Sequence, residues 1–177
     1  MKTGFFEAVK SCLALSDPNS KCAAVAALAE ALEPGDLDRN LDYPVDPIGP
    51  PGRPARPELV DASRVRRRRL GSEAGRAALV HAIAHIEFNA INLALDAAYR
   101  FRGMPSEFYQ DWISVAVDEA RHFGLLQTRL QEMGHEYGDF PAHNGLWEMA
   151  EKTADSCLLR MALVPRVLEA RGLDVTP

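Results

Sequence analysis

Three residues on two neighbouring segments carry side chains that can bind a metal ion together. Glu87 lies in the apolar stretch 81–92, while Glu119 and His122 form a Glu-x-x-His pair in the segment 118–123. A carboxylate on one helix beside such a pair on the next helix is half of the ligand set of di-iron carboxylate proteins. Oxygen donors with an imidazole favour iron or manganese over copper or structural zinc. These residues therefore predict a metal site.

Two long helices must position these three residues. The alanine-rich, apolar stretch from Glu73 to about Phe101 predicts a helix buried in a bundle, with Ser72 as its N-cap. A second helix is predicted from Ser106 to about Met133, with Gly134 as its C-terminal cap. Because the connection around Gly103 is short, we expect the two helices to pack antiparallel.

The two glutamates are expected to lie at the same height in this helix pair. Glu87 is 16 residues before Gly103 (103 − 87 = 16) and Glu119 is 16 residues after it (119 − 103 = 16). Each acid also lies on an apolar stripe, so both are expected to point into the core. An unpaired buried carboxylate is costly, and a shared divalent cation would offset that cost. The two stripes are Val80, Ile83, Ala84, Ala90, Ile91 and Ala94, and Trp112, Val115, Ala116, His122, Phe123 and Leu126.

The Glu-x-x-His motif alone is a weak signal. With 13 glutamates and 5 histidines, about 0.4 matches are expected by chance (13 × 5/177). A second match, Glu132-x-x-His135, is interrupted by a glycine at the helix end and is interpreted as a surface coincidence. His81 and His85 lie on another face of the first long helix, with Glu87 about 200° round from His85. They are interpreted as hydrogen-bonded interfacial histidines, although His85 could still orient a metal ligand.

A third carboxylate ligand is expected from a helical region predicted over about 145–171, in which Pro165 should cause a kink or a new helix start. If the helix begins near 145, the height argument favours a position near 158, closer to Asp155 than to Glu169. A start near Pro165 would remove this objection to Glu169. Two further carboxylates on this region are Glu148 and Glu151.

The N-terminal third has a different character. Residues 5–15 and 19–33 predict a helical hairpin, broken at Asp17-Pro18, whereas residues 34–60 hold seven of the twelve prolines and predict an extended strap. We therefore divide the chain into an N-terminal region, 1–60, and a helical bundle, 61–177. The arginine run 64–69 is interpreted as a solvated segment that pairs with acidic surface, rather than as a phosphate-binding arm. Tyr99, Tyr109 and Trp112 are expected to serve packing.

Composition indicates a soluble globular protein, with 47% hydrophobic and 25% charged residues in 177. The predicted helices, with no convincing strand between them, indicate an all-α fold. The net charge of −5 gives no general attraction to DNA or to a membrane surface. No uninterrupted apolar run approaches the roughly 20 residues of a bilayer span, and an early acidic residue argues against a signal peptide. Cys12, Cys22 and Cys157 follow no motif spacing and are expected to be reduced thiols in the cytoplasm.

Four segments resemble an uncharacterised bacterial family of the ferritin-like superfamily, whose members look like relatives of the bacterial di-iron tRNA hydroxylase. The segments are HIEFNAINLALD (85–96), DEARHF (118–123), YGDFPAH (137–143) and MALVPRVLEARGLDVTP (161–177). The resemblance implies a ferritin-like four-helix bundle with Glu87, Glu119, His122 and Glu169 as metal ligands. It also implies an iron cofactor, with two Fe in a complete site, and oxygen-dependent oxidoreductase or hydroxylase activity.

The resemblance further implies a fourth core helix beyond Pro177 with a second Glu-x-x-His motif. The bundle over 61–177 is therefore expected to hold three of four core helices, as a truncated product or as one half of a homodimer that completes the site. The substrate class implied is a small molecule or a modified RNA, with no DNA and no membrane partner. The competing hypotheses are a non-catalytic iron-binding protein and a metal-free helical interaction protein.

Overall fold

The structure, a computed structural model, describes residues 4–32, 46–65 and 70–164. This part of the chain is mostly helical and contains no strand, so the all-α prediction is confirmed. A single isolated bridge pairs Leu59 with Ala142. It ties the segment before the bundle to the loop 133–144.

The predicted N-terminal hairpin is present as α1 (Phe5–Ala14) and α2 (Pro18–Leu32). Asp17 ends the connection between them, and its carboxylate accepts a hydrogen bond from the Ser20 amide (2.8 Å), as an N-cap does. Residues 46–61 form no helix, as the proline content predicts, and a short 3-10 helix, η1 (Ala62–Arg64), follows.

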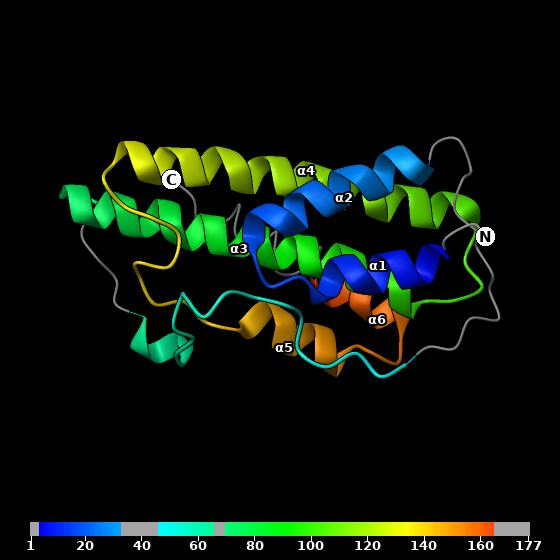
Figure 1. The fold of residues 1–177 in the computed structure, drawn as a ribbon. Coiled ribbons are helices and arrows are strands. Elements are labelled where there is room, and N and C mark those ends of the chain that lie inside the picture. Colours follow the sequence, from blue (N-terminus) through cyan, green and yellow to red (C-terminus); the bar gives the residue numbers. More distant parts are fainter. Residues whose placement is uncertain (1–3, 33–45, 66–69, 165–177) are drawn as a thin grey trace.

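The two predicted long helices are α3 (Glu73–Arg100) and α4 (Ser106–Glu132). The Ser72 hydroxyl accepts a hydrogen bond from the Gly75 amide (3.0 Å), which confirms the predicted N-cap. Gly103 adopts a φ of 70° in the turn that reverses the chain, a conformation that favours glycine. Figure 1 shows α3 and α4 running side by side in opposite directions. Among the described helices, their contact is the most extensive.

The hairpin α1–α2 packs on α3 and α4 and shares one hydrophobic core with them. Tyr109 lies edge-on to both Phe5 and Phe6, with ring centroids 5.6 Å away in each case. Its hydroxyl donates to the carbonyl of Phe101 (3.1 Å), so Tyr109 serves packing and closes the α3–α4 turn, as expected.

The third helical region differs from the prediction of one helix over 145–171. It is divided into α5 (Gly145–Lys152) and α6 (Cys157–Met161), with the break well before Pro165. The Thr153 hydroxyl donates to the Met149 carbonyl (2.8 Å), and Ser156 starts α6 as a side-chain N-cap. These local hydrogen bonds compete with a continuous helix and explain the break.

By length and composition α3 could cross a bilayer, with a mean hydropathy of 1.3 over its most apolar stretch. Half of that stretch is buried inside the protein, as in the core helix of a bundle. Its contacts with α4, the N-terminal hairpin and α5 account for the buried half of that stretch.

Candidate metal centre

Glu87 on α3 and Glu119 and His122 on α4 converge, as predicted. One ligand atom from each of the three residues lies within 4.8 Å of the other two. Nδ1 of His122 is 3.2 Å from Oε2 of Glu119 and 4.0 Å from Oε2 of Glu87. The ligand atoms therefore face a common point between two helices that are fixed by their own packing.

The expectation that both acids point into the core is wrong in part. The side chains of Glu87 and Glu119 keep 21% and 18% exposure, and that of His122 keeps 43%. On the stripes that carry them, Ala84, Ile91 and Phe123 are buried, but Ile83 and Val115 are exposed. The core is centred on the sides of α3 and α4 that face α1 and α2, so the three residues lie at its edge.

His122 is oriented by contacts on both ring nitrogens. The Arg121 guanidinium lies 3.3 Å from Nε2 and donates to it, so the neutral ring carries its proton on Nδ1 and shares it with Glu119. A cation bound between the carboxylates would replace that proton at Nδ1. The ring thus presents the correct nitrogen to the point where the acids converge.

Two carboxylates and one imidazole fit a divalent iron or manganese ion by their donor chemistry. They bring two negative charges and one neutral nitrogen donor to a half-buried position, where a cation relieves the repulsion between the acids. Among the described residues, these three are the one group of acidic, histidine or cysteine side chains with such an arrangement. They leave coordination positions open to further ligands.

A cavity of about 50 Å³ opens beside Glu119, between α3, α4 and the segment around α6. Its walls are mostly apolar, and Arg160 is the basic residue among them. The residues that line it are Ala90, Leu93, Ala97, Trp112, Val115, Glu119, Arg160 and Val164. Trp112, which was expected to serve packing alone, also forms part of this wall.

None of the described candidates for the third carboxylate belongs to the group of Glu87, Glu119 and His122. Asp155, Glu148 and Glu151 are exposed and stand outside the cluster, and Glu151 accepts a hydrogen bond from the Trp147 indole (3.0 Å) instead. The height argument that favoured Asp155 depended on one continuous helix over 145–171, which α5 and α6 do not form. Glu169 lies outside the described residues.

The two residues of the second Glu-x-x-His match pair with other side chains rather than with each other. Glu132 pairs with Arg129 at the surface (2.8 Å), and His135 contacts Asp139 (3.4 Å). Gly134 separates the two residues with a φ of 74°, which ends α4 before they can share a face.

His81 and His85 are buried and hydrogen-bonded, which confirms their interpretation as interfacial histidines. Nε2 of His81 accepts from the Gly138 amide (2.9 Å), and Nδ1 of His85 contacts the Tyr137 hydroxyl (2.9 Å). Burial lowers the pKa of each imidazole to about 4. Both rings hold the loop after α4 against α3, and neither belongs to the group around Glu87.

The two histidines belong to a buried polar stripe on α3 that was not among the predicted features. Four of its five residues bond a segment outside the α3–α4 pair, whereas Asn89 donates to the His85 carbonyl on α3 itself (2.8 Å). Asn92 accepts a hydrogen bond from Lys21 of α2, whose amine also donates to the Gly52 carbonyl (2.8 Å), and Asp96 binds Arg160 of α6 (2.6 Å). The stripe consists of His81, His85, Asn89, Asn92 and Asp96. Their spacing of three and four residues was the available signal.

Comparison with known sequences places the chain in one family. It belongs to the family described as "Protein of unknown function (DUF455)", whose profile matches residues 14–177. Glu87, Glu119, His122 and Glu169 all lie within the matched part.

A particular relative is an uncharacterized protein of Haemophilus influenzae (strain ATCC 51907 / DSM 11121 / KW20 / Rd), 47% identical over 185 residues. The alignment covers 99% of this chain and 64% of the relative, so the chain spans less than two thirds of that protein's length. No solved structure matches the chain.

Proposed function

We propose that this chain is a ferritin-like metal-binding protein and that Glu87, Glu119 and His122 form part of a di-iron centre. The activity we propose is an oxygen-dependent oxidoreductase reaction of hydroxylase type, in the cytoplasm. The observation that supports it is the convergence of three metal-binding side chains from two antiparallel helices, within 4.8 Å of one another. Such carboxylates and Glu-x-x-His pairs on facing helices are the pattern of ferritin-like di-iron sites.

The role of the protein in this proposal is to hold ligands and to exclude water. Bound iron would supply the redox chemistry with oxygen. Glu87 and Glu119 would hold the metal, His122 would bind through Nδ1, and Arg121 would keep that ring in place from the other side. The apolar walls beside Glu119 would receive the part of a substrate that approaches the centre.

The remaining ligands must come from elsewhere. Val164, the last described residue, lines the same cavity as Glu119, and Glu169 follows five residues later. We propose Glu169 as the third carboxylate on this ground and on the resemblance. A second Glu-x-x-His pair would come from chain beyond Pro177 or from a second copy of the protein.

The enzymatic part of the proposal is tested by oxygen consumption. Purified protein is loaded with ferrous iron and supplied with a reductant, beside Glu119→Ala and His122→Ala variants with matched helical content. Iron-dependent oxygen consumption that is lost in both variants is the expected result. Iron that binds to the wild type with no oxygen consumption would favour the non-catalytic iron-binding alternative.

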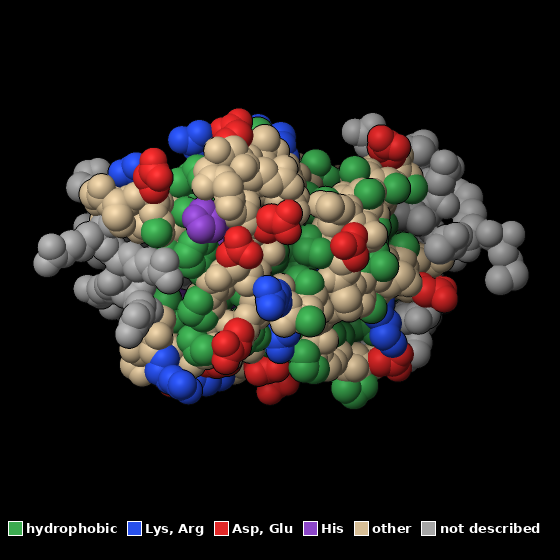
Figure 2. All heavy atoms as spheres, turned by 60° about the vertical axis from the view of Figure 1, so that its left-hand side comes forward, with side chains coloured by type: hydrophobic (Ala, Val, Ile, Leu, Met, Phe, Trp, Pro, Cys, Tyr) green, Lys and Arg blue, Asp and Glu red, His purple; other side chains and the backbone are tan. Residues whose placement is uncertain are grey.

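A metal-free interaction protein is the second candidate, and two observations favour it. His122 already bonds Glu119 directly, so part of the group is satisfied without a cation. Large apolar side chains are also exposed, including Leu158 (80%) and Leu125 (60%). Figure 2 shows hydrophobic side chains distributed among acidic and basic ones over one face of the molecule. This candidate predicts that Glu119→Ala changes no property of the protein except its charge.

A further inference from the structure

We infer that Arg160 and Asp96 are positioning residues for the candidate metal centre: their ion pair fixes the wall of the cavity beside Glu119. This inference rests on the proposed metal-binding function. It concerns residues that contact neither Glu87 nor His122 and that act through the placement of α6.

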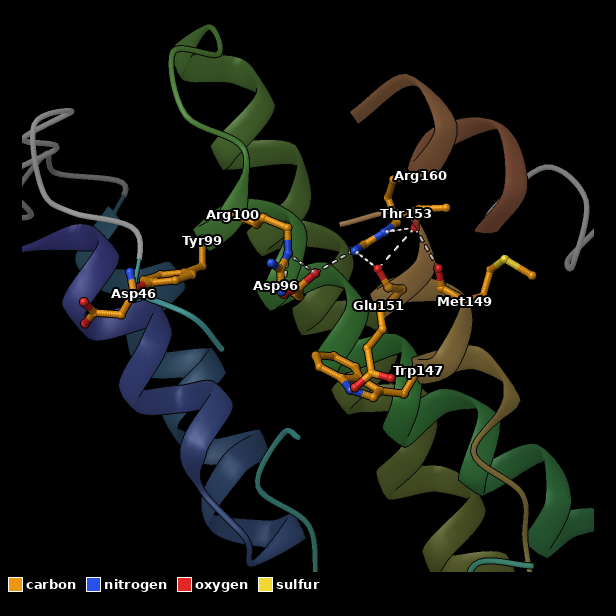
Figure 3. Close-up of polar contacts among 10 residues, drawn as sticks. Asp46, Asp96, Tyr99, Arg100, Trp147, Met149, Glu151, Thr153 and Arg160 are labelled. Carbon is orange, nitrogen blue, oxygen red and sulfur yellow. Dashed lines mark hydrogen bonds and ion pairs between the residues drawn. The ribbon is translucent and has the colours of Figure 1, made fainter. Parts of the chain in front are cut away.

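The ion pair is almost completely buried. Nη1 of Arg160 donates to Oδ2 of Asp96 (2.6 Å), and the two side chains are 2% and 0% exposed. Nε of Arg160 donates to the Thr153 hydroxyl (2.8 Å), and Nη2 donates to the Ala150 carbonyl (2.6 Å). All three nitrogens of the guanidinium are thus bonded, and Figure 3 shows them reaching from α6 to α3 and to the end of α5.

Asp96 has a second basic partner. Arg100, one turn later on α3, donates to Oδ1 of Asp96 (2.7 Å). Asp96 therefore keeps an ion pair when the Arg160 guanidinium is removed. This makes Arg160→Met a selective variant: it breaks the link between α3 and α6 and leaves no unpaired buried charge on α3.

The ion pair between Arg160 and Asp96 determines the position of α6. This helix has five residues, too few to be stable alone, and Leu158 and Leu159 point to solvent. Arg160 and Val164 are the buried residues of the segment 157–164, four positions apart and on one side of it. Both line the cavity that contains Glu119, together with Leu93 of α3.

A displaced α6 would open that cavity. Val164 would leave the apolar cluster that it forms with Leu93 and Trp147, and water would reach Glu119 from the side that is now covered. Water that competes for a carboxylate and for the open metal positions weakens cation binding and changes the coordination. Mutation of the outer residues that hold metal ligands in place commonly changes metal affinity by about 10–100-fold, and the apolar shell around a site controls its access to solvent.

The test is a titration of the full chain with Co²⁺ alone, followed by visible absorption, which reports the coordination geometry. For Arg160→Met we expect circular dichroism close to that of wild type, faster amide exchange in 157–164, a Co²⁺ dissociation constant raised about tenfold, and an altered spectrum. Arg129→Met, which removes a guanidinium from the surface pair with Glu132, is the matched control and should bind Co²⁺ as wild type does.

Arg160→Lys provides a second variant if Arg160→Met does not fold. It keeps the charge but loses the planar fork that reaches Asp96, Thr153 and Ala150 together, so it should give a smaller change in the same direction. A folded variant of either kind with wild-type affinity and spectrum would overturn the positioning role alone. Absence of Co²⁺ binding in the wild type would instead overturn the proposed metal site, and the inference with it.

Discussion

The Glu87 carboxylate on α3 lies 4.0 Å from Nδ1 of His122 on α4. This contact depends on the register of two antiparallel helices, since a slip by one turn, about 5.4 Å, would separate the groups. The register is set by apolar contacts on the other side of both helices, such as Phe88 against Phe123 (ring centroids 5.4 Å apart). The core therefore holds Glu87, Glu119 and His122 together without a cation.

Glu87→Gln should separate metal binding from folding. Without metal the variant should be as stable as wild type or slightly more stable, because one of two neighbouring carboxylates loses its charge. With Mn²⁺ the wild type should gain stability by mass action, and the variant should gain much less. Thermal unfolding with chelator and with Mn²⁺ measures both effects. An equal Mn²⁺-induced rise in Tm in both proteins would remove Glu87 from the site.

Asp96→Asn should be among the more destabilising single changes in the described chain. It leaves the buried Arg160 guanidinium without its carboxylate, a type of change that costs about 3–5 kcal/mol. Arg160→Met should cost less, because Asp96 keeps its bond to Arg100. Denaturant unfolding in the presence of chelator compares them. The control is Arg129→Met at the surface, for which a change within about 0.5 kcal/mol is expected; a similar small change for Asp96→Asn would contradict the account.

Acid should destabilise the contact between α3 and the loop after α4. Burial lowers the pKa of His81 and of His85 from 6.5 to about 4, so both are neutral in the folded protein at neutral pH. Between pH 6.5 and 4 the unfolded chain binds protons that the folded chain does not, so stability falls as the pH falls through this window.

The loss near pH 5 is up to about 2 kcal/mol for each histidine. Urea unfolding near pH 7 and near pH 5, with chelator present, measures it. His81→Gln should reduce the loss, because its amide oxygen can accept from Gly138 without a titrating group. Thr128→Ala, on the exposed side of α4, should show the wild-type loss. A loss as large in His81→Gln as in wild type would show that His81 does not contribute.

Glu169→Ala should weaken Co²⁺ binding if Glu169 is the third carboxylate ligand. Asp155→Ala, the matched change at an exposed residue before α6, should leave binding as it is in wild type. Both affinities can be measured in one titration series with Glu119→Ala as the reference for loss of the site. The reverse result, with an effect of Asp155→Ala alone, would restore the ligand that the height argument favours.

The helices α3 and α4 and the convergence of Glu87 with Glu119 and His122 could be predicted from the sequence. Ser72, Gly103 and Gly134 mark helix ends by local chemistry, and equal distances from Gly103 align the acids. These signals are local, so they require no knowledge of the rest of the fold.

The position of the site at the edge of the core could not be predicted in this way. It depends on which sides of α3 and α4 the N-terminal hairpin covers, and a stripe of apolar residues does not specify its partner. The buried polar stripe on α3 could not be predicted for the same reason. His81 and Asp96 stand out by spacing, but their partners, Gly138 and Arg160, lie 57 and 64 positions away. The break between α5 and α6 could be predicted in part, because serine is a preferred N-cap residue and Ser156 precedes α6.

Metal content tests the central claim most directly. The purified wild-type chain and Glu119→Ala are compared by plasma mass spectrometry, with Glu132→Ala, from the second Glu-x-x-His match, as the control. We predict iron or manganese bound to the wild type and to Glu132→Ala and lost from Glu119→Ala, with near two ions per chain if the centre is complete. No metal in the wild type, or equal metal in wild type and Glu119→Ala, would contradict the proposed centre.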